Sequence, residues 1–172
     1  MGIEKRNMVI GIIGGHRKNT TRQALIFAER VGKRLAELGF VVVTGGGSGI
    51  MEAALRGAKS VGGTTFAITK GNRKDDANNY ADHVFPTSLD LAFMNVLMWS
   101  SDAIIAFDGK FGTMCEIGLA LDIGKPIVLF GRHELICAKQ IKERKCLYVE
   151  SYSKEGIEKT MSFILKNYSA RK

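Results

Sequence analysis

The chain has 172 residues, of which 45% are hydrophobic and 24% are charged, a composition typical of one globular domain. Its formal net charge is +8, but no basic run resembles a nucleic-acid-binding tail and aromatic residues do not alternate with the cations, so nucleic-acid binding is not expected. No apolar stretch is long enough to span a membrane and no signal peptide precedes Met8, so we expect a cytoplasmic protein. The three cysteines form no CxxC pair, and we expect them to be reduced thiols.

The first half of the chain alternates short apolar runs with segments of helical periodicity. Residues 8–13 predict a buried strand that ends at Gly14 and Gly15. Thr20 or Thr21 can cap a helix whose apolar residues recur every three or four positions and which ends at Gly39. The next expected elements are a strand over 40–44, a helix over 51–61 and a strand over 64–69.

A polar segment, residues 70–80, separates this half from the next. It is long for a connection in a compact α/β domain, so it is either a binding loop or a solvated excursion. After a short strand over 83–85, Thr87 to Asp90 has the spacing of a capping box and predicts the start of a helix that runs to Trp99. The remaining expected elements are strands over 102–107, 126–130 and 145–149 and helices over 113–123, 133–142 and 153–168.

Strands and helices therefore alternate along the whole chain, and the strands are apolar without a two-residue period. This pattern is typical of a parallel sheet that is covered on both faces. We predict a single α/β domain over residues 1–172, a Rossmann-like, doubly wound parallel sheet of about six or seven strands with helices on both faces. Residues 1–7 and 169–172 are expected to be frayed termini.

Two glycine-rich segments each connect an expected strand to an expected helix, and together they predict a site for a phosphorylated ligand. Glycine lets the backbone approach an anion, and the free N–H groups and dipole at a helix start favour phosphate. For the first segment the alternative is tight packing of strand against helix. The predicted ligand-binding residues are Gly14, Gly15, Gly45, Gly46, Gly47, Ser48, Gly49, Asp108, Gly109, Lys110, Gly112 and Thr113.

Glu116 is the candidate catalytic residue of the second segment. Thr113 and Glu116 have capping-box spacing, so Glu116 either bonds the backbone of its own helix start or acts as a general acid/base or ribose acceptor beside the phosphate. Lys110 either contributes a cation to the phosphate or is solvated. His16, His83 and His133 lie far apart in the sequence, and no metal site is expected.

Residues 8–130 resemble the LONELY GUY-like Rossmann proteins, long described as possible lysine decarboxylases, and are most similar to the branch that includes the molybdenum-cofactor carrier proteins. The resemblance rests on residues 45–54 with Gly57-Ala58, Gly62-Gly63, residues 77–80, Pro86-Thr87, residues 101–103, Gly112-Thr113 with Glu116, and residues 124–126. It implies a bound nucleotide or molybdenum cofactor, with no cofactor required, and a homo-oligomer. The apolar helix around Met94 to Trp99 fits a subunit interface or the core.

The hydrolase members of this family cleave the N-glycosidic bond of cytokinin riboside 5′-monophosphates and carry the motif PGGxGTxxE. Here the motif reads from Asp108 to Glu116, with Asp108 in place of proline and Lys110 in place of the second glycine. The family's arginine on the preceding helix falls on Phe93, which cannot supply a positive charge. Arg17 or Arg73 could replace it from a loop, and Asn78 is a further possible loop contact.

Three functional hypotheses follow. The first is a protein that binds a phosphorylated nucleotide or pterin, such as a molybdenum-cofactor carrier, and that does not hydrolyse it. The second is a nucleoside 5′-monophosphate phosphoribohydrolase with altered residues, and the third, suggested only by charge, is a nucleic-acid-associated Rossmann protein. Phe93 and Lys110 favour the first hypothesis over the second, whereas Glu116 supports the second.

Overall fold

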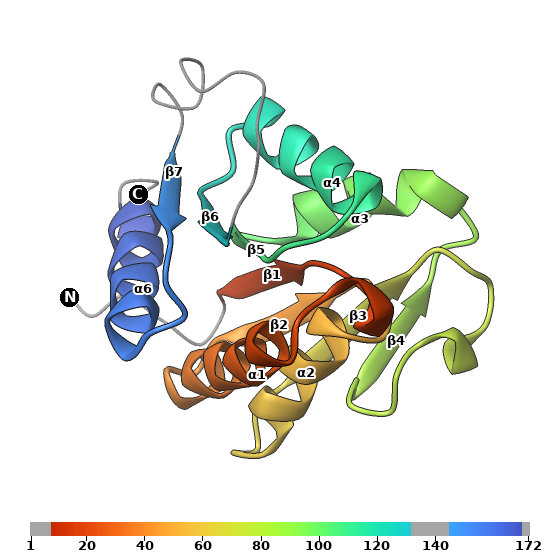
Figure 1. Ribbon diagram of the computed structural model, residues 1–172. Coiled ribbons are helices and arrows are strands. Elements are labelled where there is room, and N and C mark those ends of the chain that lie inside the picture. The colour runs from red at the N-terminus through yellow and green to blue at the C-terminus, as the bar shows by residue number, and fades with distance from the viewer. Residues whose placement is uncertain (1–7, 132–144, 170–172) are drawn as a thin grey trace.

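The computed structural model describes residues 8–131 and 145–169, which contain a seven-stranded sheet (Figure 1). All neighbouring strands are parallel, and their order is β4-β3-β2-β1-β5-β6-β7. The strands are β1 (Val9–Ile13), β2 (Val41–Thr44), β3 (Thr65–Thr69), β4 (His83–Pro86), β5 (Ala103–Ala106), β6 (Ile127–Phe130) and β7 (Cys146–Val149).

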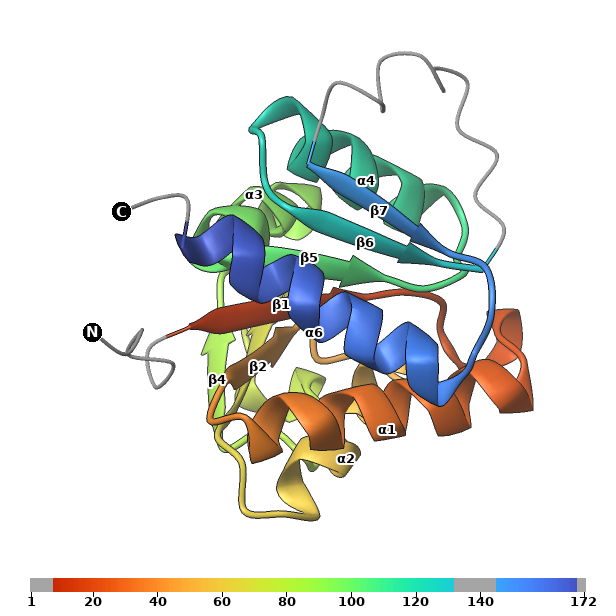
Figure 2. The ribbon, with the colours of Figure 1, turned by 90° about the vertical axis from the view of Figure 1, so that its left-hand side faces the viewer.

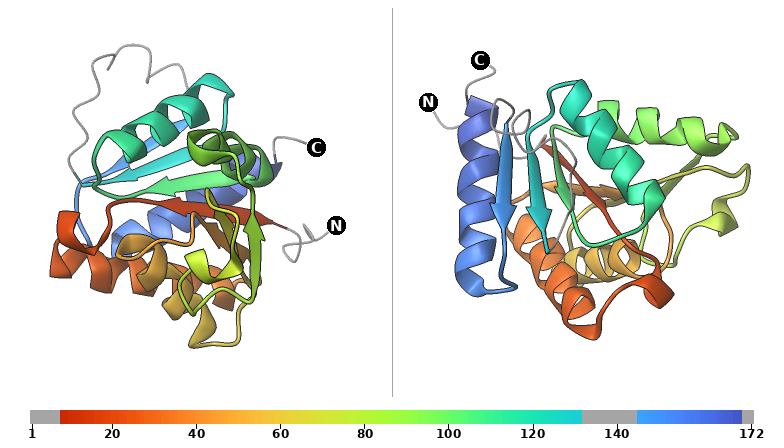
Figure 3. Two further views of the ribbon diagram at one scale, coloured as in Figure 1. Left: turned by 90° about the vertical axis from the view of Figure 1, so that its right-hand side faces the viewer. Right: turned by 45° about the horizontal axis from the view of Figure 1, so that its top comes forward.

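Two groups of helices cover the two faces of this sheet. Helices α1, α2 and α6 pack on one face, and α3 and α4 pack on the other (Figures 2 and 3). The helices are α1 (Arg22–Glu37), α2 (Ile50–Lys59), α3 (Phe93–Ser100), α4 (Phe111–Asp122) and α6 (Lys154–Ser169), with short 3₁₀ turns η2 (Arg17–Asn19), η3 (Lys74–Asp76) and η4 (Asp90–Ala92). No described helix is long and apolar enough to cross a lipid bilayer.

The predicted fold class is confirmed, and the core explains why the strands are apolar throughout. In β5 and β6 every residue is buried, because both faces of these central strands are covered by helices. The aromatic rings of Phe27, Phe107 and Phe130 pack together on the α1 face, with centroid separations of 5.0 to 6.3 Å. This packing fixes α1 against the carboxyl ends of β5 and β6.

The strand order reverses between β1 and β5, and this reversal fixes where a ligand can bind. The chain winds outward in one direction from β1 to β4 and in the other direction from β5 to β7. In doubly wound sheets the loops that leave two such central strands turn to opposite faces and open a crevice at their carboxyl ends. The Gly15 N–H donates to the carbonyl oxygen of Asp108 at 2.8 Å, which joins the two loops at this point.

Several sequence-based boundaries are confirmed, and two capping predictions are wrong. Thr21 caps α1 by accepting a hydrogen bond from the Ala24 N–H at 3.1 Å. However, α4 begins at Phe111, so Thr113 lies inside its first turn and does not cap it. Thr87 does not cap α3 either: its hydroxyl donates to the Thr69 carbonyl, and a 3₁₀ turn precedes α3. The helix predicted over residues 133–142 lies outside the described residues.

Candidate functional site

A cavity of about 620 Å³ opens at the carboxyl ends of β1, β2 and β3, beside the first turns of α3 and α4. Its position is the crevice that the strand order predicts, and its volume is in the range of small-molecule sites. The lining combines backbone from three strand-to-helix loops with side chains from both helices. The predicted site residues that line it are Gly14, Gly15, Gly45, Gly47, Lys110, Gly112, Thr113 and Glu116.

The amino-terminal turn of α4 is the part of the cavity wall best suited to an anion. The first intrahelical bond runs from the Met114 N–H to the Lys110 carbonyl at 3.0 Å, so the N–H groups of Phe111, Gly112 and Thr113 have no acceptor among the described residues. No acidic residue lies in this turn, and Lys110 stands directly before it. A Cβ added to Gly112 would find only the Met94 methyl, 4.0 Å away, so the space above this turn is open.

Glu116 lies one turn further along α4 and faces the same cavity. Its side chain is only 8% exposed, and no described residue forms a hydrogen bond or ion pair with its carboxyl group. Burial raises the pKa of Glu116 to about 7, because the ionised form loses its hydration. Since Thr113 is not the cap of α4, the capping-box interpretation of Glu116 is wrong. Glu116 is thus a buried acid that can give or accept a proton near neutral pH.

The first two residues of α3 form an apolar wall that connects the two glycine loops. The Phe93 ring packs against the backbone of Gly45, where a Cβ would lie 3.3 Å from Cε2 of the ring. Met94 reaches the other loop at Gly112, and Met51 of α2 adds a second thioether to the lining. Aromatic and thioether groups of this kind favour contact with a flat heterocycle.

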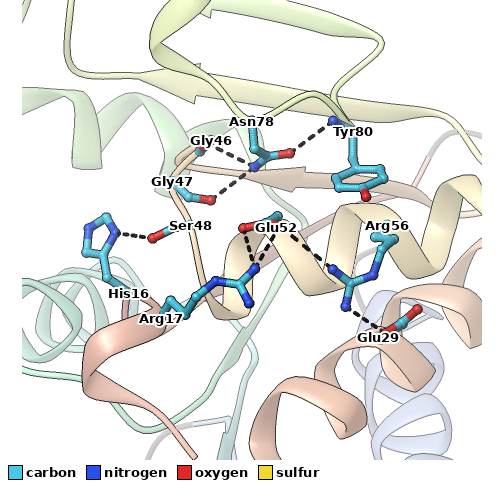
Figure 4. Close-up of polar contacts among 10 residues, drawn as sticks. All are labelled: His16, Arg17, Glu29, Gly46, Gly47, Ser48, Glu52, Arg56, Asn78 and Tyr80. Carbon is cyan, nitrogen blue, oxygen red and sulfur yellow. Dashed lines mark hydrogen bonds and ion pairs between the residues drawn. The ribbon is translucent and has the colours of Figure 1, made fainter. Parts of the chain in front are cut away.

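The first glycine loop, residues 45–49, is braced by side chains from outside it (Figure 4). The Asn78 side-chain amide donates to the carbonyl oxygens of Gly46 and Gly47, both at 3.0 Å, and its backbone N–H donates to Gly46 at 2.8 Å. The Ser48 hydroxyl lies 3.3 Å from Nδ1 of His16. These contacts make Asn78 a support for the loop, and it does not line the cavity.

Protein groups engage part of the turn of α2 that follows this loop. The Ile50 N–H donates to the Gly15 carbonyl at 3.1 Å, and Glu52 places a carboxylate in the first turn. Both oxygens of Glu52 accept hydrogen bonds from the Arg17 guanidinium, at 3.0 and 3.1 Å. This carboxylate opposes an anion at the start of α2, and Arg17 is engaged by it.

Arg56 continues this network away from the cavity (Figure 4). Its guanidinium lies 3.8 Å from Glu52 and 2.8 Å from Glu29 of α1. The hydrogen bond from Arg56 lowers the pKa of the Glu29 carboxyl group. The network therefore ties α1, α2 and the β1–α1 loop into one unit behind the first glycine loop.

The other predicted site residues lie outside the cavity lining. Arg73 is exposed and pairs with Asp75 at 3.1 Å, so it does not replace the missing arginine. The Asp108 carboxylate points to the α1 face, where it accepts a hydrogen bond from the Tyr152 hydroxyl at 3.0 Å. The predicted residues that do not line the cavity are Arg17, Gly46, Ser48, Gly49, Arg73, Asn78, Asp108 and Gly109.

Several lining residues were not predicted from the sequence. They come from the end of β3, from the segments that follow β1 and β3, from the 3₁₀ turns, and from the first turns of α2 and α3. In doubly wound sheets, ligands bind at the carboxyl ends of the strands near the point where the strand order reverses. This rule would have indicated the lining residues that follow β1 and β3. These residues are His16, Asn19, Met51, Thr69, Lys70, Gly71, Asp76, Leu91, Phe93 and Met94.

Two further observations concern the Thr69 hydroxyl group and the possibility of a metal site. The Thr69 side chain is 2% exposed, and its hydroxyl has no hydrogen-bond partner in the described part of the chain. Within residues 8–131 and 145–169, no three histidine, cysteine or carboxylate side chains are grouped as a metal site would require.

The sequence matches a known protein family and a related archaeal protein. A model of the SLOG cluster4 family matches residues 7–157. An uncharacterized protein of Archaeoglobus fulgidus is 40% identical over 120 residues, which cover 70% of this chain and 78% of that protein.

Two similar solved structures carry functional descriptions. The molybdenum cofactor binding protein of the phototrophic bacterium Rippkaea orientalis has a TM-score of 0.81 and 30% identity, over 93% of this chain and 98% of its own. The molybdenum cofactor carrier protein of Chlamydomonas reinhardtii has a TM-score of 0.80 and 27% identity, over 94% and 99% of the two chains. Both likenesses cover more than nine-tenths of this chain.

Proposed function

Because the chain belongs to the SLOG cluster4 family, we propose that its cavity binds a phosphorylated heterocyclic ligand and that this ligand is the molybdenum cofactor, which the protein carries as cargo. The observation that supports this most is the open first turn of α4, where Lys110 precedes three N–H groups that have no acceptor among the described residues. The likeness to molybdenum cofactor carrier proteins supports the choice of ligand.

The lining residues fit the two chemically different ends of such a ligand. Its phosphate would accept hydrogen bonds from the N–H groups of Gly112 and Thr113, with Lys110 adding charge. The planar pyrimidine ring of its pterin would lie against Phe93 and Met94, where apolar and thioether groups favour such a ring.

We propose that the protein does not hydrolyse nucleotides, although Glu116 is suited to proton transfer. Glycosidic cleavage needs a substrate held by charge-assisted contacts, and the wall where hydrolases carry arginine holds Phe93. Arg17 and Arg73 are paired with Glu52 and Asp75. We therefore expect AMP and cytokinin ribotides to release no free base. Release that disappears in Glu116→Ala would contradict this proposal.

Cargo binding is tested directly with molybdenum cofactor released from a molybdoenzyme. The protein is mixed with the cofactor under nitrogen, desalted and analysed for molybdenum and for pterin fluorescence after oxidation. We expect about one molybdenum per chain and competition by AMP only at much higher concentration. Binding of AMP with no retained molybdenum or pterin would reject the cofactor while leaving the phosphate site; binding of neither would reject both.

We also propose that the protein forms a homo-oligomer through the α3–β4 surface, as the family resemblance implies. Val96 of α3 and Phe85 of β4 line one apolar hollow and are 37% and 52% exposed, and Trp99, one turn further along α3, is 64% exposed. Large apolar side chains that gather on one surface commonly mark an interface. Light scattering should give a mass above that of one chain, and Trp99→Glu should reduce it. A monomer at micromolar concentration would contradict this interface.

A further inference from the structure

A second concave surface lies between α1 and α6, on the sheet face opposite α3 and α4. Both helices lie over this face, at an angle to each other (Figure 2). Two hollows, of about 700 and 430 Å³, lie along them and share Phe27 and Arg30, so they form one groove. None of the residues that line the groove lines the proposed cofactor cavity.

The groove has a basic rim. Five cationic side chains line it: Arg22, Arg30, Lys33, Arg34 and Lys154. The two carboxylates in the lining, Glu37 and Glu158, both lie beside Arg34, at 3.6 and 3.2 Å. In the described part of the chain the other four cations form no ion pair, so the rim carries an excess of positive charge.

The floor of the groove is apolar. Phe27 and Ile157 are nearly buried at its base, and Ile26 is 44% exposed at its side. The cations Arg22, Arg30 and Lys33 follow one another along α1, and the eleven residue steps from the first to the last span about 17 Å at 1.5 Å per residue. An extended peptide of about five residues spans this length.

We infer that the α1–α6 groove is a docking site for an acidic segment of a partner protein, in which carboxylates alternate with apolar residues. The basic rim complements the carboxylates, and the apolar floor accepts the side chains between them. Single-stranded nucleic acid fits less well, because the groove offers no free aromatic face on which bases could stack. Tyr152, the ring at its end, packs on Phe27 at 5.1 Å and donates its hydroxyl to Asp108.

The test measures binding of a fluorescein-labelled peptide of five Glu-Glu-Leu repeats by fluorescence anisotropy. Its controls are a Gln-Gln-Leu peptide of equal length and a fifteen-residue oligo-dT. We expect the acidic peptide to bind, to lose affinity several-fold between 50 and 300 mM salt, and to bind at least tenfold more tightly than either control. Absence of peptide binding at 100 μM, equal binding of the Gln-Gln-Leu peptide, or tighter binding of oligo-dT would overturn the inference.

A pair of charge-reversal variants locates the binding surface. The variant Arg30→Glu/Lys33→Glu changes two exposed groove positions, and Lys18→Glu/Lys74→Glu makes the same charge change at exposed positions outside the groove. We expect the first to weaken peptide binding at least tenfold and the second less than threefold, with unchanged circular dichroism and subunit mass. Equal losses in both variants, or a changed subunit mass in the groove variant alone, would contradict an acidic partner segment in this groove.

Discussion

The two glycine-rich loops both connect a strand to a helix, but their surroundings in the folded protein differ. In the first, residues 45–49, Asn78 and His16 contact the loop, and Glu52 and Arg17 occupy the helix start that follows. In the second, residues 108–113, the helix start has no acidic residue and its N–H groups face an open cavity. Glycines in a connection between a strand and a helix therefore accompany close packing in the first loop, and an open helix start, where we propose that an anion binds, in the second.

The strongest test of this difference places a large side chain above the first turn of α4. Gly112→Phe should abolish binding of the phosphorylated ligand, a loss of at least 100-fold or about 3 kcal/mol, because the ring fills the space above the free N–H groups. Calorimetric titration with the cofactor measures it. The matched control is Gly118→Phe, an exposed position of the same helix with no neighbouring atoms around an added Cβ. Equal affinity in both variants would show that the phosphate does not bind at this helix start.

The first loop should respond in stability. Gly49 has a φ of 79°, and a Cβ there would collide with the Gly15 carbonyl oxygen and the Arg17 nitrogen. We expect Gly49→Ala to lower the free energy of unfolding by about 3 kcal/mol, whereas Gly112→Ala should raise it slightly. Urea denaturation followed by circular dichroism compares the two. A Gly49→Ala protein as stable as the wild type would show that the two loops do not pack as described.

Glu116 should make the stability of the folded protein depend on pH. Its pKa is about 7 in the folded protein and 4.5 in the ordinary unfolded state, so the folded form binds the proton more tightly. Its contribution to stability is fully present below pH 4.5 and is lost as pH rises through 7, on the order of 3 kcal/mol in total. Relative to wild type, Glu116→Gln should therefore gain stability between pH 5 and pH 8. The same difference between the two proteins at both pH values would argue against a buried, neutral carboxyl group.

Phe93 tests the wall between the two loops. Phe93→Ala should weaken cofactor binding by about 10-fold, since stacking of an aromatic ring on a heterocycle contributes roughly 1–3 kcal/mol. Phe93→Leu, which keeps apolar volume without the ring face, should lie between alanine and wild type. Titration of each variant gives the ratio of dissociation constants. If the leucine variant binds as tightly as wild type, apolar contact and not ring stacking accounts for the contribution of Phe93 to affinity.

The smallest expected effect on affinity comes from Lys110, which we compare with Arg73. Lys110→Ala should weaken binding by about threefold at low salt and less at high salt, because an exposed lysine beside a phosphate is screened. Arg73→Ala should leave affinity unchanged, since Arg73 is exposed and paired with Asp75. An affinity loss at Arg73 larger than that at Lys110 would move the phosphate toward the 70–80 segment.

The sequence predicted the fold because its elements are locally marked. Apolar runs ended by glycine identified the strands, and Thr21 and Gly39 bounded α1 as they do in the structure. The two capping boxes misled because Thr113 and Thr87 find other positions once the chain folds: Thr113 lies inside α4, and the Thr87 hydroxyl bonds to the end of β3. Local spacing cannot distinguish a cap from these tertiary contacts.

The candidate site was predicted in part. Glycine and the PGGxGTxxE-like spacing located Gly112, Thr113 and Glu116 at the cavity. The direction of a side chain was not predictable, since Asp108 and Asn78 lie beside lining residues yet point to Tyr152 and to the loop backbone. Phe93 was noticed as a missing arginine, whereas its position against Gly45 makes it a wall of the cavity. Such roles depend on contacts between segments far apart in the chain.

The measurement that tests the central claim most directly is the amide ¹H–¹⁵N spectrum of the protein during titration with a phosphorylated ligand. The phosphate is expected at the start of α4, so the amide signals of Gly112 and Thr113 should move furthest downfield, as hydrogen-bonded N–H groups do. Those of Met51 and Glu52 at the start of α2 should move much less. Shifts that are largest at Met51 and Glu52, with Gly112 and Thr113 unchanged, would contradict the assignment of the anion site to the second loop.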